Sequence, residues 1–326
     1  MRVVEYNQYG PPSVLHLTEV PKPLPRDNEI LIRVRATTVT AGDCRLRALK
    51  VPFGFRTLSR LFLGFSRPRR RVLGMELAGD IESVGKTVGK FKPGDSVFAY
   101  VGIDMGCYAE YKCMSEDGAV VLKPPNLNYQ EAAALSFGGT TALNFLNRAK
   151  IKSGEKVLVN GASGAVGSAA IEIAKHFGAE VTGVCSSANL KWVRSLGVDH
   201  IIDYTKEDFT ANGKKYDIIF DAVGSALYRR CKISLEANGR FLMVVGGLLE
   251  MMLIPWVALT SRRKLIGGAA ANKADDLRYL AKLAEAGEFK PAIDRCYLLE
   301  DIAVAHAYVD TGRKKGNVVI TLEKAD

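Results

Sequence analysis

Val157-Leu-Val-Asn-Gly-Ala-Ser-Gly-Ala-Val-Gly167 is the stretch of sequence that decides the fold. Val157-Leu-Val159 is apolar enough for a buried strand, and an amphipathic helix is expected from Ser168 to Phe177. A strand, a tight glycine turn and a helix in this order are typical of a nucleotide-binding βαβ unit. The turn brings the backbone close to a pyrophosphate, and the helix N-terminus presents free N–H groups and its positive dipole end. We therefore predict that a dinucleotide binds at Gly161, Ala162, Ser163, Gly164, Ala165, Val166 and Gly167.

The residues around this turn alternate between apolar strands and helical segments. Strands are expected from Lys156 to Asn160, from Glu180 to Cys185, from Tyr216 to Ala222 and from Gly239 to Val245. A helix is expected from Asn189 to Leu196. Strands that alternate with helices indicate βαβ units and therefore an α/β fold with a doubly wound parallel sheet.

The first third of the chain has a different pattern, with many short β-strands. Ile30 to Arg35 and Ser96 to Tyr100 are expected strands, separated by turns rich in glycine and proline. The pattern changes near Lys123-Pro-Pro125. The last segment, from about Ala274, is expected to hold a helix and a final strand from Asn317 to Leu322.

The composition is that of a folded protein. A chain of 326 residues, 48% of them hydrophobic, can bury one large or two ordinary cores, and its formal charge of +10 suits an anionic ligand without naming one. The N-terminus lacks the apolar core of a signal peptide, and the apolar stretch from Leu248 to Leu259 is too short to cross a bilayer. The cysteines form no Cys-x-x-Cys pair, so we expect reduced thiols and a cytoplasmic protein. They are Cys44, Cys107, Cys113, Cys185, Cys231 and Cys296.

The end of the second strand of the βαβ unit indicates which dinucleotide binds. An NAD site usually carries Asp or Glu about 20 residues past the glycines, bonded to the ribose 2′-hydroxyl. The segment from Gly183 to Ala188 contains no acid, and the hydroxyl of Ser186 with the cations Lys191 and Arg194 suits a 2′-phosphate. We therefore predict NADPH as the cofactor. The alternative is that both cations are ordinary solvated residues of a surface helix.

Further motifs accompany the glycine turn. They are Leu73-Gly-Met-Glu-Leu-Ala-Gly79, Phe91-Lys-Pro-Gly-Asp-Ser-Val97, Ala133-Ala-Leu-Ser-Phe-Gly-Gly-Thr-Thr-Ala142, Ser195-Leu-Gly-Val-Asp199, Asp203-Tyr204 and Gly316-Asn-Val-Val-Ile320. As a set they are specific. With them the chain resembles the medium-chain dehydrogenase/reductase superfamily, in its zinc-free quinone-oxidoreductase-like branch, over nearly its whole length.

The resemblance implies two domains with the active site in the cleft between them. A GroES-like β-rich catalytic domain comprises residues 1–125 and is completed by about 270–326, and a Rossmann NADPH-binding domain comprises residues 126–269. In NADPH-using relatives a lysine and a tyrosine contact the 2′-phosphate, and they match Lys191 and Tyr204 here. Because ligands of such sheets lie outside the carboxyl ends of the strands, Val223 and Gly246 are expected beside the cofactor. Relatives often form homodimers through a sheet edge, which here lies near Val244 and Leu265.

The residues at the family's zinc positions argue against a metal. Where the zinc-dependent alcohol dehydrogenases have a cysteine and a histidine, this chain has Thr40 and Met75. A hydroxyl and a thioether are poor zinc ligands, so we predict no metal site. Glu76, which follows Met75, is interpreted as a structural hydrogen-bond acceptor.

Without a metal, hydride transfer needs an acceptor that is already electrophilic. Quinones and α,β-unsaturated carbonyls have this property, so a small conjugated acceptor is the expected substrate. The resemblance points to Thr40 and Asp43 near the cleft and to Thr141 near the nicotinamide as catalytic candidates. The alternative for Asp43 and Thr141 is that they cap turns and helices.

Residues 56–71 form a basic and apolar stretch, Arg-Thr-Leu-Ser-Arg-Leu-Phe-Leu-Gly-Phe-Ser-Arg-Pro-Arg-Arg-Arg. The first interpretation is a solvated loop between β elements, with a few residues tucked into the core. The second is a hydrophobic lid over a lipophilic acceptor, and the third is a patch that contacts anionic membrane lipids.

Two other functions compete with a zinc-independent reductase. One is a nucleotide-binding or RNA-binding protein with the same fold and little turnover. The charge of +10 permits it, but outside residues 56–71 no basic stripe is interleaved with aromatic residues, so no nucleic-acid partner is expected. The other is a zinc-dependent alcohol dehydrogenase, which the missing ligands disfavour.

Overall fold

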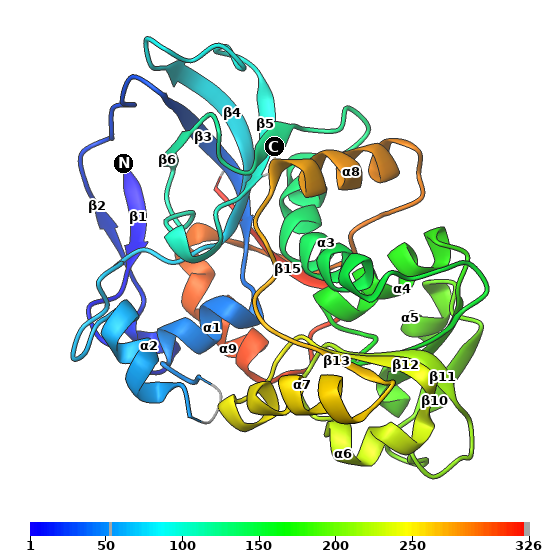
Figure 1. The fold of residues 1–326 in the computed structure, drawn as a ribbon. Helices are drawn as coiled ribbons and strands as arrows, with labels where there is room; N and C mark the ends of the chain where they lie inside the picture. The colour runs from blue at the N-terminus through cyan, green and yellow to red at the C-terminus, as the bar shows by residue number, and fades with distance from the viewer. Residues whose placement is uncertain (52–53, 323–326) are drawn as a thin grey trace. The chain divides into compact units, whose positions relative to one another are not determined.

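The computed structural model describes residues 1–51 and 54–322, and it divides the chain into two compact units (Figure 1). The first unit consists of Met1–Val51, Arg56–Phe137 and Asn272–Asp326. The second consists of Pro52–Phe55 and Gly138–Ala271. The first is built around a mainly antiparallel sheet and the second around a parallel one, so the predicted fold class is confirmed.

The second unit holds a six-stranded sheet in the order β10-β9-β8-β11-β12-β13, and every neighbouring pair is parallel. The order reverses its direction between β8 and β11, which makes their carboxyl ends the topological switch point where such folds bind ligands. The strands are β8 (Lys156–Asn160), β9 (Glu180–Cys185), β10 (His200–Asp203), β11 (Tyr216–Asp221), β12 (Leu235–Met243) and β13 (Lys264–Ile266).

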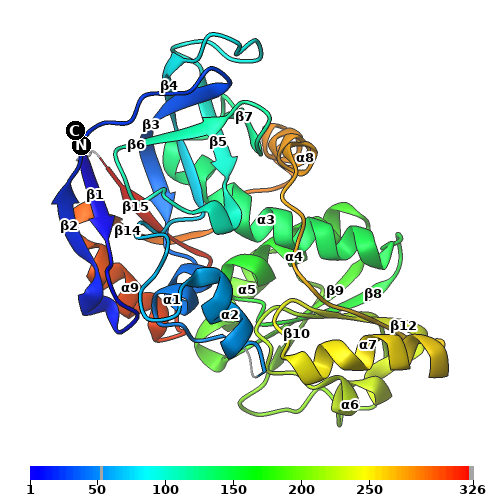
Figure 2. The same ribbon diagram turned by 60° about the vertical axis from the view of Figure 1, so that its left-hand side comes forward.

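The helices of this unit pack on the sheet, as Figure 2 shows from a second side. Helix α4 covers β8 and β9, α5 lies against β9 and β10, and α7 lies against β13. They include α4 (Ala165–His176), α5 (Leu190–Ser195), α6 (Tyr228–Cys231) and α7 (Leu248–Thr260), with the short helices η3 (Ser187–Asn189) and η4 (Lys232–Ser234).

Several elements of this unit differ from the sequence-based expectation: helices α6 and α7 were not predicted, and α4 begins at Ala165 rather than at Ser168. Strand β12 begins at Leu235 rather than at Gly239. Its pairing with β11 is irregular, since Tyr216 pairs with Leu235 but Ile218 pairs with Arg240. This irregularity lets Asn238 and Gly239 lie within the strand. Strand β10 was not predicted, since its four residues are too few for a clear apolar pattern.

The first unit contains a seven-stranded sheet in which the last strand of the chain pairs with a strand of the N-terminal third. β15 pairs antiparallel with β3 and parallel with β14, and β1 pairs with β2 in a small separate sheet. The strands are β1 (Arg2–Glu5), β2 (His16–Glu19), β3 (Glu29–Thr38), β4 (Glu76–Val84), β5 (Ser96–Tyr100), β6 (Tyr111–Ser115), β7 (Val120–Leu122), β14 (Ile293–Leu298) and β15 (Asn317–Thr321).

Two helices of the first unit position the candidate site. Helix α1 (Ala41–Arg47) packs against α9 (Ile302–Asp310), and both border the core that β3 and β15 help to form. Helix α3 (Tyr129–Ala149) begins in the first unit and ends in the second. The remaining helices of the first unit are η1 (Pro12–Val14), α2 (Arg56–Leu63), η2 (Gly102–Asp104), α8 (Ala274–Glu285) and η5 (Leu299–Asp301).

The interpretation of residues 56–71 as a loop was wrong in part, because its first eight residues form α2. Leu61, Phe62 and Phe65 are largely exposed there, while Leu63 packs on the core. The sequence of α2 resembles a loop because the helix is short, mixes apolar with basic residues and is followed at once by Gly64. Among the described helices, none combines the length and the apolar character needed to cross a membrane.

Candidate active site

The glycine turn follows β8 and leads into α4, as expected. Gly161 has a φ of +81°, in the left-handed region that favours glycine. Gly167 packs so tightly against the carbonyl group of Gly161 that no side chain fits between them. Gly164 is the N-cap residue of α4 and makes no side-chain cap.

The first turn of α4 contains backbone N–H groups that can donate hydrogen bonds to a ligand. Ser168 donates its N–H to the carbonyl oxygen of Gly164, but the N–H groups of Ala165, Val166 and Gly167 meet no acceptor among the residues that the structure describes. Three such groups at the positive end of a helix of 12 residues form a binding site for a phosphate group. The turn therefore fits the pyrophosphate of a dinucleotide.

Side chains from the neighbouring strand ends hold the turn in place. The buried Asp221 at the end of β11 accepts hydrogen bonds from the N–H groups of Val223, Gly224 and Ala226, and Asn160 donates to its carboxylate at 3.0 Å. This arrangement places the Val223 side chain directly over Gly161. Val223 thus lies beside the glycine turn, at the carboxyl ends of β8 and β11.

The other predicted cofactor contacts of this unit lie at successive strand ends. Gly246 follows β12, where a Cβ atom would collide with the Met243 side chain. Ser163 accepts a hydrogen bond of 3.0 Å from the Asn189 amide, which ties the glycine turn to the segment after β9. Ser186 is half-buried at the end of that strand.

The segment after β9 carries both cations, and the end of the neighbouring strand β10 adds one acid. Lys191, in the first turn of α5, is exposed and has no ion-pair partner in the described part of the chain. Tyr204 is 62% exposed. Asp203 pairs in register with Cys185 and accepts hydrogen bonds from the hydroxyl groups of Ser187 and Thr205, which lower its pKa. The sequence analysis names this carboxylate only within the Asp203-Tyr204 motif and does not place it beside the end of β9, because it comes from the neighbouring strand β10.

In the first unit, Thr40 and Asp43 form one hydrogen-bonded pair at the start of α1. Thr40 is the N-cap residue, its hydroxyl donates to Asp43 at 2.5 Å, and the N–H groups of the two residues complete a capping box. Gly74 also donates its N–H to Asp43, at 3.0 Å. Burial raises the pKa of Asp43 to about 6, against the effect of the hydrogen bonds from Thr40 and Gly74.

The alternative interpretation, that these residues cap a turn or a helix, therefore agrees with the structure for Asp43 and is wrong for Thr141. Thr141 lies in the middle of α3, where no helix terminus needs a cap, and it is buried. It belongs to the second unit, whereas Thr40 and Asp43 belong to the first.

Met75 and Glu76, at the start of β4, lie close to this pair. The Met75 sulfur lies 3.9 Å from the Thr40 hydroxyl. Glu76 is fully buried and accepts hydrogen bonds from the Thr38 hydroxyl and the Phe137 N–H, so it is a structural acceptor as expected. Burial raises the pKa of Glu76 to about 8.

This donor set does not fit a zinc ion. Thr40 already gives its proton to Asp43, and a thioether is too soft a ligand for zinc to be usual. Within residues 1–51 and 54–322, no group of three or more His, Cys, Asp or Glu side chains is placed to hold a metal.

Comparisons with known proteins agree with this architecture. Residues 26–125 match the alcohol dehydrogenase GroES-like domain, and residues 196–320 match the family described as zinc-binding dehydrogenase. The chain is 30% identical to the chloroplast envelope quinone oxidoreductase homolog of Arabidopsis thaliana, over 98% of each chain. It is also 30% identical to the chloroplastic NADPH-dependent alkenal/one oxidoreductase of the same plant, over 98% of this chain and 79% of that protein.

A solved structure shows the same likeness in three dimensions. The quinone oxidoreductase from Coxiella burnetii superimposes with a TM-score of 0.88 and 30% sequence identity, covering 99% of each chain. Identity of this size over whole chains exceeds what a shared fold alone requires. The chain belongs to the medium-chain dehydrogenase/reductase superfamily, in its quinone oxidoreductase-like branch, and is an oxidoreductase that depends on a nicotinamide dinucleotide.

Proposed function

We propose that this protein is an NADPH-dependent reductase of quinones or α,β-unsaturated carbonyls that works without a catalytic zinc. The observation that carries the proposal is the pairing of Thr40 with Asp43 beside Met75, at the positions where zinc enzymes of the family hold their metal. A hydroxyl that is hydrogen-bonded to a buried carboxylate suits proton delivery and does not suit metal ligation.

The cofactor contacts come from the second unit. The free N–H groups of Ala165, Val166 and Gly167 would bind the pyrophosphate, and Lys191 with Tyr204 and Ser186 would bind the 2′-phosphate. Asp203 is already engaged by two hydroxyl groups, whereas Lys191, like Arg194, makes no ion pair among the described residues, so its cation is available to a phosphate. The name of the NADPH-dependent alkenal/one oxidoreductase supports the same choice of cofactor.

The substrate class follows from the side chains of Thr40 and Met75, which do not suit a Lewis-acid metal. When bound, the nicotinamide supplies a hydride, and a conjugated acceptor takes up the electron pair on its own oxygen. The Thr40–Asp43 pair would then provide the proton, and Thr141 would support the nicotinamide from the second unit. The relatives named above act on quinones or on alkenals and alkenones, according to their names.

The test is a panel of acceptors assayed with both cofactors. We expect NADPH oxidation with a 1,4-benzoquinone and with a 2-alkenal, faster than NADH oxidation, in protein from which chelators have removed bound metals. Tight nucleotide binding without turnover of any acceptor would instead indicate a binding protein. A zinc content of one per chain, with activity lost on chelation, would indicate an alcohol dehydrogenase.

We further propose that the protein is a homodimer in the cytoplasm. Among the described residues, strand β13 is at the edge of the parallel sheet and pairs with β12 alone, which leaves its outer edge for a second copy. The neighbouring helix α7 exposes Leu249, Met252 and Trp256, which a partner would cover. Light scattering after size-exclusion chromatography tests this, and a mass near 35.5 kDa would contradict it.

A further inference from the structure

Residues 44–75 carry almost all of the excess positive charge of the protein. This stretch holds nine Lys and Arg residues and no Asp or Glu, while the whole chain has a formal charge of +10. The remaining residues therefore carry a net charge of only +1. The cations are Arg45, Arg47, Lys50, Arg56, Arg60, Arg67, Arg69, Arg70 and Arg71. Neither the proposed cofactor contacts nor the proposed proton donor accounts for them.

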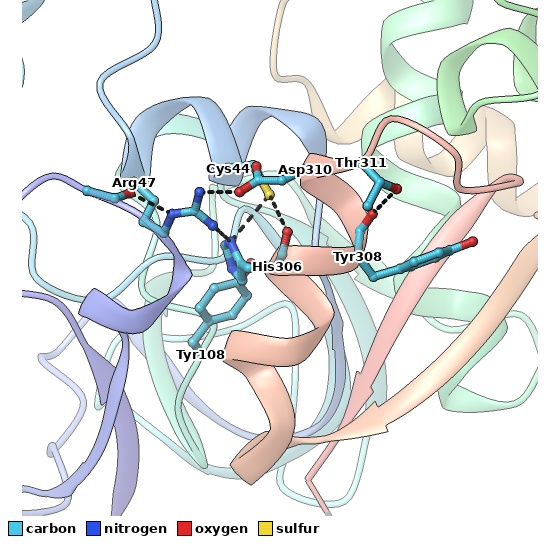
Figure 3. A network of polar contacts seen from close by, with 8 residues as sticks. Cys44, Arg47, Tyr108, His306, Tyr308, Asp310 and Thr311 are labelled. Atoms are coloured by element: carbon cyan, nitrogen blue, oxygen red, sulfur yellow. Dashed lines mark hydrogen bonds and ion pairs between the residues drawn. The ribbon is translucent and has the colours of Figure 1, made fainter.

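Two of these arginines are neutralised by ion pairs within the first unit. Arg47 is 1% exposed and donates to Asp310 at 2.5 Å (Figure 3). Arg70 donates to Asp104 at 2.8 Å. By contrast, three further side chains are exposed and make no ion pair with any residue that the structure describes, namely Arg67, Arg69 and Arg71. Their charges are available to an anion at the surface.

Exposed apolar side chains lie beside these charges. Leu61 and Phe62 lie on the last turn of α2, and Phe65 follows two residues after its end. The three side chains are between 62% and 70% exposed. The guanidinium group of Arg60 lies 5.6 Å from the centre of the Phe65 ring, so a cation and an aromatic ring of this segment are in contact.

Hydrogen bonds hold this segment to the first unit. The N–H of Gly64 donates to the carbonyl oxygen of Arg60 at 3.0 Å, and the N–H of Arg69 donates to that of Leu63 at 2.8 Å, so the chain folds back on the end of α2. The Tyr9 hydroxyl donates to the carbonyl oxygen of Gly64 at 3.1 Å. The exposed side chains are therefore already arranged, and a partner binds them at a lower cost in conformational entropy.

We propose that this segment docks the protein on a membrane surface that is rich in anionic phospholipids. The α2 surface, as we call it, consists of Leu61, Phe62, Phe65, Arg67, Arg69 and Arg71. A guanidinium group binds a phosphate through two parallel hydrogen bonds, and its long stem keeps the charge at the level of the headgroups while neighbouring apolar side chains enter the acyl layer. The positive charge of the segment complements the negative charge of such a membrane.

The side chains of the α2 surface favour a lipid partner over a nucleic acid. Nucleic-acid bases stack on aromatic rings, but Leu61 and the nearby Ile103 are aliphatic and have no flat face for a base. Ile103 is exposed and directly precedes Asp104, the partner of Arg70. Leucine and phenylalanine bordered by arginine are typical of helices that lie in a membrane interface. A lid over a neutral acceptor would need the apolar side chains but not the three uncompensated charges.

The experiment is vesicle flotation with the full-length protein, and it requires no turnover. Vesicles of phosphatidylcholine alone are compared with vesicles that contain about 30% phosphatidylglycerol, at about 0.1 M NaCl and at about 0.5 M NaCl. We expect the protein to float with the anionic vesicles at low salt, to bind them less at high salt, and to stay behind with phosphatidylcholine alone. The inference is wrong if the wild-type protein binds neither kind of vesicle.

Two combined variants test the two parts of the α2 surface. Replacement of Arg67, Arg69 and Arg71 by Gln should weaken binding to anionic vesicles by about 100-fold, because each arginine near such a surface contributes about fivefold. Phe62→Ser combined with Phe65→Ser should weaken it by about 10-fold or more, since the rings no longer enter the acyl layer. All five side chains are exposed, and thermal unfolding verifies that the variants fold.

The matched control removes three cations elsewhere. Lys206, Lys214 and Lys232 are exposed, belong to the second unit and make no ion pair among the described residues. Their replacement by Gln changes the net charge by the same amount as the arginine variant and should leave vesicle binding nearly unchanged. An equal loss in the two variants would show that the overall charge binds the membrane and would contradict a specific α2 surface.

A tryptophan at position 65 reports directly on insertion. The emission of Phe65→Trp, after subtraction of the wild-type signal from Trp192 and Trp256, should shift to shorter wavelength when anionic vesicles are added. An unshifted emission with vesicle-bound protein would exclude insertion of residue 65.

Other occupants of the α2 surface would give different results, and each would overturn the proposal. One is binding of single-stranded polyuridylate by a protein that binds no vesicles. Another is dissociation of a dimer in the combined Phe62 and Phe65 variant, which would show that a second copy covers the surface. A third is a higher KM for a quinone in that variant without vesicle binding by the wild type, which would identify a lid. A protein that binds anionic vesicles but reduces no acceptor would overturn only the proposed function.

Discussion

A Cβ atom on Gly167 would lie 2.1 Å from the carbonyl oxygen of Gly161. Both residues belong to the turn between β8 and α4, and the backbone contact between them sets how closely the helix approaches the strand. A methyl group at position 167 must therefore push the start of α4 away from the strand, together with its free N–H groups.

Gly167→Ala should abolish dinucleotide binding and destabilise the protein by about 1–3 kcal/mol, since overpacking of a rigid contact costs this much. Gly164→Ala is the control, because a Cβ atom there would meet only the Gly161 carbonyl oxygen, at 3.7 Å. Isothermal titration with NADPH and urea unfolding measure the two effects. Equal behaviour of the two variants would show that the close contact does not matter.

Lys191→Ala should weaken NADPH binding and leave NADH binding nearly unchanged. Only NADPH carries the 2′-phosphate, and the loss of one charge-assisted contact corresponds to roughly 10-fold or more in Kd. Arg194→Ala, on the same helix, is the control. A loss of the same size for both cofactors would refute the role of Lys191, and a larger loss with Arg194→Ala would move that role to Arg194.

Thr40→Val should lower turnover strongly at saturating NADPH without changing the Kd of NADPH. Valine also removes the N-cap of α1, which costs about 1 kcal/mol of stability. Thr40→Ser keeps the hydroxyl and should retain most of the activity and the stability. Steady-state kinetics with thermal unfolding of both variants tests this, and full activity of Thr40→Val would exclude the hydroxyl as the proton donor.

Glu76 makes stability depend on pH. Its pKa is raised by burial from 4.5 to about 8, although the hydrogen bonds from Thr38 and Phe137 and the charge of Lys314 act in the opposite direction. Between these two pH values the folded protein holds a proton that the unfolded chain has lost, so stability falls as pH rises from about 4.5 to 8 and levels off above.

Glu76→Gln should remove part of this loss. The amide keeps an acceptor for the Phe137 N–H and can donate to the Thr38 hydroxyl, without a charge to bury. We expect the variant to be more stable than the wild type at pH 9, by about 1 kcal/mol or more, and to differ little at pH 5. Urea unfolding at both pH values provides the measurement, and an identical pH dependence of the two proteins would contradict the assignment.

Local patterns predicted the elements around the glycine turn well. Strands β8 and β9 have the bounds that the sequence indicates, because an apolar run bordered by turn residues depends only on near neighbours. Strand β10 was not predicted, because four residues carry too little pattern, so the position of Asp203 beside β9 was not predicted either. Helix α2 was not predicted either, because the sequence of a short helix that contains arginine resembles that of a solvated loop.

The sequence by itself determined the conformation of the glycine turn and the kinds of donor at Thr40 and Met75. These properties belong to single residues and their immediate neighbours: a positive φ favours glycine, and a hydroxyl or thioether does not bind zinc well. Only the tertiary structure decided which buried polar side chains of the first unit contact one another. His306 meets Tyr108 across 198 positions of sequence and Arg47 across 259, and burial and hydrogen-bond direction arise from such distant partners.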